Sequence, residues 1–277
     1  MKKTTKGIML LTVASMVLTG CGAGGAYSGY SSAYNKVTAN GGLDADFDVT
    51  ITMDGETSND TGNFKLDTSD GNNILYYEME VGDDTITQFS DGEYIYTDAQ
   101  EHKTKYSMNS KPSASSDKQE TKQKDSSGTF NTSEFISQFS SFLEAGKIKE
   151  LGMLSPIEQA AITDISEEGG VYTLTFSDSL VQKYLNLMIE NETGEASGDT
   201  LSIDELNDFT YKATSSDDMI TKVEYSGTMV VKVPASLMAS GEETSYDLDF
   251  NIVITFNNPG EAVSIDLPST DGYEEVK

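Results

Sequence analysis

The sequence of 277 residues has one cysteine, one histidine, no tryptophan and no arginine. A single cysteine has no partner within the chain, so we expect the fold to hold together without a disulfide. A catalytic triad or a zinc site needs further nucleophilic or soft ligand groups around a histidine. His102 instead lies among polar residues in DAQEHKTKY, as is typical of a surface turn. We therefore expect no catalytic residues, no bound metal, no cofactor and no enzymatic activity.

Positive charge is also scarce. The chain has 18 lysines and 46 acidic residues, so its net charge is −28. Nucleic acid phosphates require a basic face, so nucleic acid is excluded as a partner. A strongly acidic surface keeps a protein soluble, and it also attracts cations or basic partners.

The N-terminus has the pattern of an export signal. Lys2, Lys3 and Lys6 precede an apolar run over residues 8–18, which ends in small residues. A run of roughly 11 residues is shorter than the 20 or so needed to span a bilayer. The pattern predicts a signal peptide over residues 1–20.

The end of this segment, Leu18-Thr19-Gly20-Cys21, resembles the lipobox of bacterial lipoproteins. In that family the cysteine thiol receives a diacylglyceryl group, and cleavage between Gly20 and Cys21 leaves the cysteine as the first mature residue. The resemblance implies that Cys21 anchors the chain in the cell membrane through two acyl chains. The protein would face the extracytoplasmic side, as at a Gram-positive cell surface. An ordinary secreted protein with a chance cysteine near its cleavage site is the alternative.

Composition divides the rest of the chain. Residues 21–40 are rich in Gly, Ser, Ala and Tyr and predict a flexible tether. Residues 41–277 are long enough for a single domain. Within it, residues 109–128 are polar without periodicity and predict a mobile loop.

Strands dominate this domain. Residues 43–54 (LDADFDVTITMD) and 246–256 (YDLDFNIVITF) alternate between apolar and polar side chains. Alternation over this length indicates strands with one buried and one wet face, as in an antiparallel sheet. We expect strands near 43–54, 61–67, 73–81, 84–90, 93–98, 103–108, 159–166, 170–177, 207–214, 219–233 and 244–257.

Two helices are predicted. Residues 131–146 begin with a capping box at Asn131 and Glu134, and their apolar residues share one face. A second helix is expected over 178–190. The resulting fold class is α+β: a large curved antiparallel sheet with two or three helices on its concave face.

These features resemble the LolA/LppX-like group of lipoprotein carriers and lipid-binding lipoproteins. The resemblance is carried by the lipobox at Cys21, the strands from Leu43 with the hairpin SDGEYIYTD, the mid-chain helix and the returning strands to Phe256. Members have an incomplete, curved β-barrel, and several bind acyl chains in its hollow. The resemblance therefore implies an incomplete LolA-like barrel and a hydrophobic ligand, but no motif transfers individual binding residues.

Asp44, Asp46 and Asp48 begin like a calcium-binding loop. The sixth position should be glycine and is Val49, and the twelfth should be glutamate and is Gly55. The alternation explains the three aspartates better, as the wet face of a strand.

The hydrophobic-ligand hypothesis names the apolar faces of the mid-chain helix and of the two alternating strands. A solid core would use the same side chains, so that alternative stays open. Two other functions stay open as well: an envelope interaction protein that uses its acidic surface, and a structural or assembly subunit that pairs through edge strands. The candidate lining residues are Phe135, Phe139, Phe142, Leu143, Phe47, Val49, Ile51, Phe250, Ile252 and Ile254.

Overall fold

The computed structural model of the chain describes residues 23–67, 74–81, 84–99, 102–107, 161–193, 201–238 and 241–275. Several predicted features lie outside the described residues: the signal peptide, the cleavage and lipidation site at Gly20 and Cys21, the loop at 109–128, and the helix at 131–146 with Phe135, Phe139, Phe142 and Leu143.

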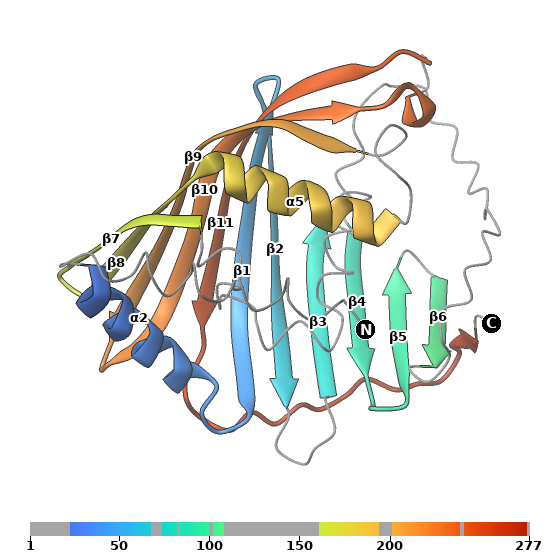
Figure 1. The fold of residues 1–277 in the computed structure, drawn as a ribbon. Coiled ribbons are helices and arrows are strands. Elements are labelled where there is room, and N and C mark those ends of the chain that lie inside the picture. The colour runs from blue at the N-terminus through green and yellow to red at the C-terminus, as the bar shows by residue number, and fades with distance from the viewer. Residues whose placement is uncertain are drawn as a thin grey trace, which may run out of the picture.

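Twelve strands form one sheet in the order β12-β6-β5-β4-β3-β2-β1-β11-β10-β9-β8-β7 (Figure 1). Consecutive strands are mostly neighbours, and the one long return places β11 beside β1. The strands are β1 (Gly42–Met53), β2 (Glu56–Asp67), β3 (Ile74–Val81), β4 (Asp84–Ser90), β5 (Tyr94–Ala99), β6 (His102–Ser107), β7 (Ile162–Glu168), β8 (Val171–Phe176), β9 (Ser202–Ser216), β10 (Met219–Val233), β11 (Thr244–Phe256) and β12 (Glu274–Glu275).

The expected fold class is wrong. The α+β arrangement with an incomplete LolA-like barrel is replaced by an open sheet that ends at β12 and β7. The sheet is mixed, because β12 pairs with β6 in parallel. Helices are few in the described part of the chain: α2 (Ala23–Val37), α5 (Asp178–Thr193) and the 3-10 turn η2 (Ala235–Leu237). Alternation in a sequence identifies each strand, but it does not determine whether the two end strands meet.

The strand predictions themselves are confirmed for most of the described chain. β1 and β11, the two alternating segments, pair antiparallel, with Phe47 opposite Ile254 and Ile51 opposite Phe250. The predicted turn at Asp54-Gly55 joins β1 to β2, and both residues have positive φ, 52° and 84°. Gly55 adopts this conformation at no steric cost, which fits a tight hairpin turn.

The two long helices lie on the same side of the sheet (Figure 1). We call this side the helix face and the opposite side the outer face. Residues directly opposite each other in a ladder point to the same face. One such row on the helix face runs across five strands: Tyr211, Tyr225, Ile252, Val49 and Asp60.

The flexible tether predicted for residues 21–40 is wrong over Ala23–Val37, which form α2. Tyr30, Tyr34 and Val37 are buried, and α2 packs against β10 and β7. The Tyr30 and Tyr211 hydroxyls are hydrogen-bonded at 2.8 Å, and the Tyr34 ring meets Phe256 edge to face at 6.1 Å. Tyrosines spaced at helical intervals therefore outweigh the low helix propensity of the glycines and serines among them.

The helix predicted over 178–190 is confirmed as α5. Contacts from Val181 to Asn186 fix the helix to β9: Val181 is buried, and the side chain of Asn186 both donates to the Ile203 carbonyl and accepts from the Ile203 amide. Leu180 and Leu187 are 44% and 53% exposed. Neither described helix is long and apolar enough to cross a membrane.

The segment after β11 runs along one end of the sheet to its far edge (Figure 1). Gly42 leaves room for it, because a Cβ atom there would lie 2.7 Å from the Val263 amide nitrogen. Near its end, the Tyr273 ring meets the rings of Phe89 and Tyr96 edge to face, at 5.8 Å and 5.2 Å. This contact positions β12 beside β6, where its two residues pair with Thr104 and Lys105 at that edge of the sheet.

Candidate functional site

The described part of the predicted ligand lining lies together on the helix face. Each residue of β1 is directly opposite its counterpart on β11, in the pairs Phe47–Ile254, Val49–Ile252 and Ile51–Phe250. Phe47, Ile51 and Ile254 are buried, and the other three are half-buried. The grouping on one face was predictable from the alternation; whether these residues contact a ligand stays a prediction.

The apolar surface continues from β1 onto β2 and β3 because Gly62 has no side chain. A Cβ at Gly62 would overlap the ring of Phe47 and the carbonyl oxygen of Glu78. The Phe47 ring therefore lies across β2 and stacks on Tyr77, with 5.5 Å between ring centroids and 5° between planes. The Tyr77 hydroxyl donates to the sulfur of Met79 at 2.9 Å. Aromatic and thioether side chains thus join three strands into one apolar patch.

One carboxylate interrupts this patch. Asp60 follows the row of Tyr225, Ile252 and Val49 onto β2, and its side chain faces the same side. It is 2% exposed and is the only buried acidic residue among those described. Its Oδ2 accepts a hydrogen bond from the Ser58 hydroxyl at 3.4 Å, which is long for this type of bond. We call Phe47, Ser58, Asp60, Gly62, Tyr77 and Met79 the Asp60 patch.

Burial dominates the electrostatics of the Asp60 patch. Desolvation raises the pKa of Asp60, and the hydrogen bond from Ser58 lowers it by a smaller amount. Burial also raises the pKa of Tyr77 far above its usual range, and the nearby negative charge of Asp60 raises that pKa further. Both shifts disfavour negative charge at this site.

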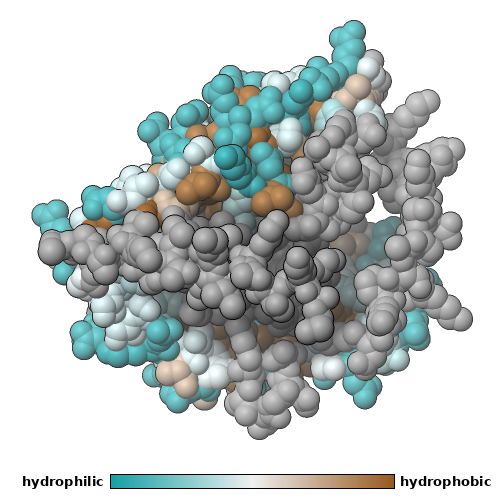
Figure 2. All heavy atoms as spheres, in the orientation of Figure 1, coloured by the Kyte–Doolittle hydropathy of each residue, from teal (hydrophilic) through white to brown (hydrophobic). Residues whose placement is uncertain are grey.

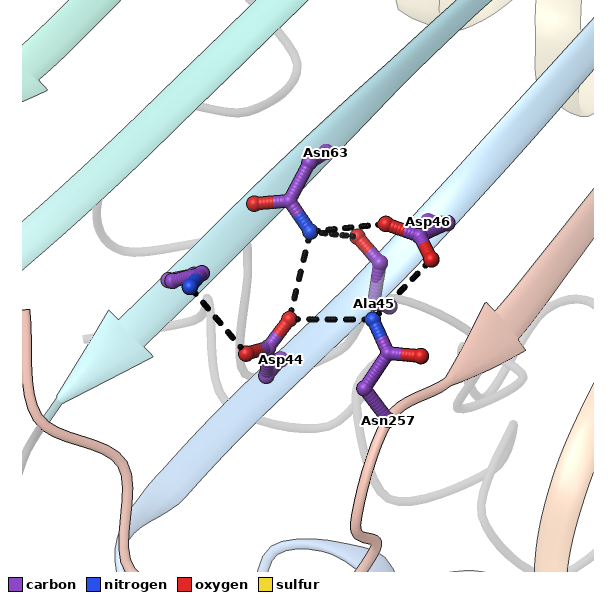
Figure 3. Close-up of polar contacts among 6 residues, drawn as sticks. Asp44, Ala45, Asp46, Asn63 and Asn257 are labelled. Carbon is purple, nitrogen blue, oxygen red and sulfur yellow. Dashed lines mark hydrogen bonds and ion pairs between the residues drawn. The ribbon is translucent and has the colours of Figure 1, made fainter.

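The aspartates of the D-x-D-x-D motif lie on the outer face, as the alternation predicts. Two asparagine amides hold Asp44 and Asp46 (Figure 3). The amide nitrogen of Asn63 donates to Asp44 at 3.2 Å and to Asp46 at 2.9 Å, and that of Asn257 donates to both at 3.2 Å and 3.1 Å. Lys65 adds an ion pair to Asp44 at 3.4 Å. These contacts join β1 and β2 to the segment after β11. In the described part of the chain, no group of acid, cysteine or histidine side chains could hold a metal ion.

Other surface features differ in character from the Asp60 patch. A recess of about 610 Å³ runs along the outward side of α2, where serines, Asn35 and Lys36 supply much of its lining. Apolar side chains are visible among polar ones around α5 (Figure 2). His102 lies exposed at the start of β6.

Comparison with known proteins gives little to build on. No family model matches the sequence, and no curated protein matches it. A crystal structure of a DUF1329 family protein from Desulfovibrio piger overlaps 87% of this chain and 95% of its own, with 10% sequence identity and a TM-score of 0.29. An overlap at that level assigns neither family nor function, so the resemblance to the LolA/LppX-like group stays a prediction.

Proposed function

We propose that this chain is a non-enzymatic, membrane-anchored extracytoplasmic lipoprotein that binds a hydrophobic ligand, an acyl chain or a lipid, on the helix face of its sheet. The main support is the group of apolar side chains on the helix face of β11, β1, β2 and β3, which includes the buried Phe47, Ile254 and Tyr77. Apolar surfaces with few polar groups are typical of small-molecule sites.

The placement of the two helices adds to this support. α2 packs on β10 and β7, and α5 packs on β9, all in one half of the sheet. Beyond β9, α5 continues in front of β1 to β4 (Figure 1). In that part of the helix Leu187 is exposed, and Leu185 and Ile189 are half-buried against the core. Segments with few buried contacts open locally at low free energy, so displacing the side chains of this part of α5 would make room for a ligand.

Pairing through edge strands is less well supported. At one edge, β12 already pairs with β6. At the other, β7 has exposed Asp164, Glu167 and Glu168, and charged residues on an edge strand discourage pairing with another chain. For the acidic-surface alternative, the hydrogen bonds of Asp44 and Asp46 within the protein favour a structural role for those two residues.

Native mass spectrometry tests ligand binding directly. The protein would be the chain from residue 21 with Cys21→Ser, which we call the soluble form, purified from a lipid-rich membrane extract. We expect a species heavier than the protein by the mass of a lipid or fatty acid, released by organic extraction. Only the bare protein mass, even after incubation with mixed membrane lipids, would contradict ligand binding.

The anchor has its own test. The full chain expressed in a Gram-positive host should incorporate labelled fatty acid and sediment with membranes, and Cys21→Ser should abolish both. Retention of the label in the Cys21→Ser variant would refute lipidation at this residue.

A further inference from the structure

Asp60 is the one buried acidic residue among those described, and its carboxylate accepts a single long hydrogen bond. The ion pairs among the described residues involve other acids, all of them more exposed than Asp60. These acids are Asp44, Asp98, Asp218, Glu224 and Glu243. Asp91 accepts two backbone amides at 2.9 Å and the Tyr96 hydroxyl at 2.8 Å. Asp60, at 2% exposure, has the 3.4 Å contact with Ser58. A buried carboxylate with so little support is costly unless a cation joins it.

The side chains of β2 on the helix face change from polar to apolar along the strand. Ser58 and Asp60 come first, then Gly62, then the buried Phe64 and Leu66. The six residue steps from Asp60 to Leu66 span roughly 20 Å of strand. Such a sequence of side chains matches a molecule with a charged head and a long apolar chain.

Charge determines which head group fits. An anionic head would lie beside a carboxylate in a site where burial already disfavours negative charge. A neutral head would leave the charge of Asp60 unbalanced. A protonated amine supplies both the opposite charge and several N–H donors, and hydrogen bonds between charged partners are the stronger ones. The stacked rings of Phe47 on β1 and Tyr77 on β3, 5.5 Å apart, lie on the same face as Asp60, on the two strands that flank β2.

We propose that the ligand of the helix face is a cationic amphiphile, whose ammonium head group binds Asp60 while its apolar chain lies along β2 toward Phe64 and Leu66. This inference rests on the proposed function, because it names the class of ligand for the same surface. It assigns Asp60 the role of selecting between head groups.

Three ligands with the same chain length test it: dodecylamine, dodecanol and dodecanoic acid. Each would be titrated calorimetrically into the soluble form, at concentrations below its solubility limit and below any micelle formation. We expect the affinity for the amine to exceed that for the alcohol on the order of tenfold, because one charged hydrogen bond contributes about that much. The acid should bind most weakly. Equal affinity for amine and alcohol would overturn the inference without any variant.

Two variants locate the preference. Asp60→Asn should abolish the preference for the amine, so that the amine and the alcohol bind with equal affinity. Glu80→Gln is the matched control, because Glu80 is exposed on the outer face of the neighbouring strand, and it should behave like the parent. An amine preference that survives Asp60→Asn would overturn the inference.

The test separates this inference from the proposed function. If the alcohol binds as tightly as the amine, the proposed role of Asp60 is refuted, but the proposed binding of hydrophobic ligands stands. Binding of none of the three ligands would overturn both. Circular dichroism of each variant confirms that a lost preference does not reflect unfolding.

Discussion

The docking of α2 can be tested by changing Tyr30. Its side chain is 3% exposed, its hydroxyl is hydrogen-bonded to Tyr211 at 2.8 Å, and its ring meets those of Tyr172 and Tyr211 at 6.0 Å and 5.8 Å. Tyr30→Phe removes the hydrogen bond alone and should lower the free energy of unfolding by about 1 kcal/mol. Tyr30→Ala also removes the ring and should lower it by about 3–5 kcal/mol.

Urea denaturation of the soluble form provides the measurement. Because the chain has no tryptophan, unfolding would be followed by far-ultraviolet circular dichroism and tyrosine fluorescence. Ser32→Ala is the control, since Ser32 is exposed on the same helix, and it should leave the unfolding midpoint nearly unchanged. A loss below about 1 kcal/mol for Tyr30→Ala would refute the docking, because truncating a packed aromatic ring costs more than that. The segment would then be the flexible tether that its composition indicates.

Three further predictions concern the two faces of the sheet. Gly62→Ala forces a methyl group against a ring and a backbone carbonyl and should lower the free energy of unfolding by about 1–3 kcal/mol, whereas Gly25→Ala, with open space around it, should not destabilise in the same urea titration. Tyr273→Ala should release the tail and expose the edge of β6, so sedimentation velocity should detect self-association. Asp271→Ala, at an exposed position, is the control and should stay monomeric. A monomeric Tyr273→Ala would contradict the prediction. Asp60→Asn should raise the free energy of unfolding at pH 7 by on the order of 1 kcal/mol. Burial raises the pKa of Asp60 in the folded state, so the folded protein holds that proton more tightly than the unfolded chain, and the gain should shrink as pH falls through the raised pKa toward about 4. A gain that persists at pH 3 would refute this cause.

Local patterns in the sequence predict most of the strands. In β1 and β11 the alternation extends over the whole strand, and one face is buried as expected. The same logic could have found Asp60: counting back by two from Leu66 and Phe64 places it on the buried face. The alternation is hard to recognise around Asp60, because its neighbours on the same face, Ser58 and Gly62, are not apolar.

α2 and β12 were missed for different reasons. In α2, glycine and serine lower helix propensity, and the tyrosines at 27, 30 and 34 reveal the helix only once a sheet is available to pack against. β12 has two residues and no periodicity of its own. It lies where it does because Tyr273 packs on Phe89 and Tyr96. Such tertiary contacts also determine which strands end the sheet, which is why the fold class could not be read from alternation.

Photo-crosslinking tests the central claim most directly, that the apolar chain of a ligand lies on the helix face between β11 and β3. A dodecylamine derivative with a diazirine in its chain would be irradiated with the soluble form, and the labelled peptides would be mapped by mass spectrometry. We expect labels on β1, β2 and β3, at Phe47, Phe64 or Tyr77, and competition by unlabelled dodecylamine. Labels confined to the outer face or to the recess along α2 would contradict the claim.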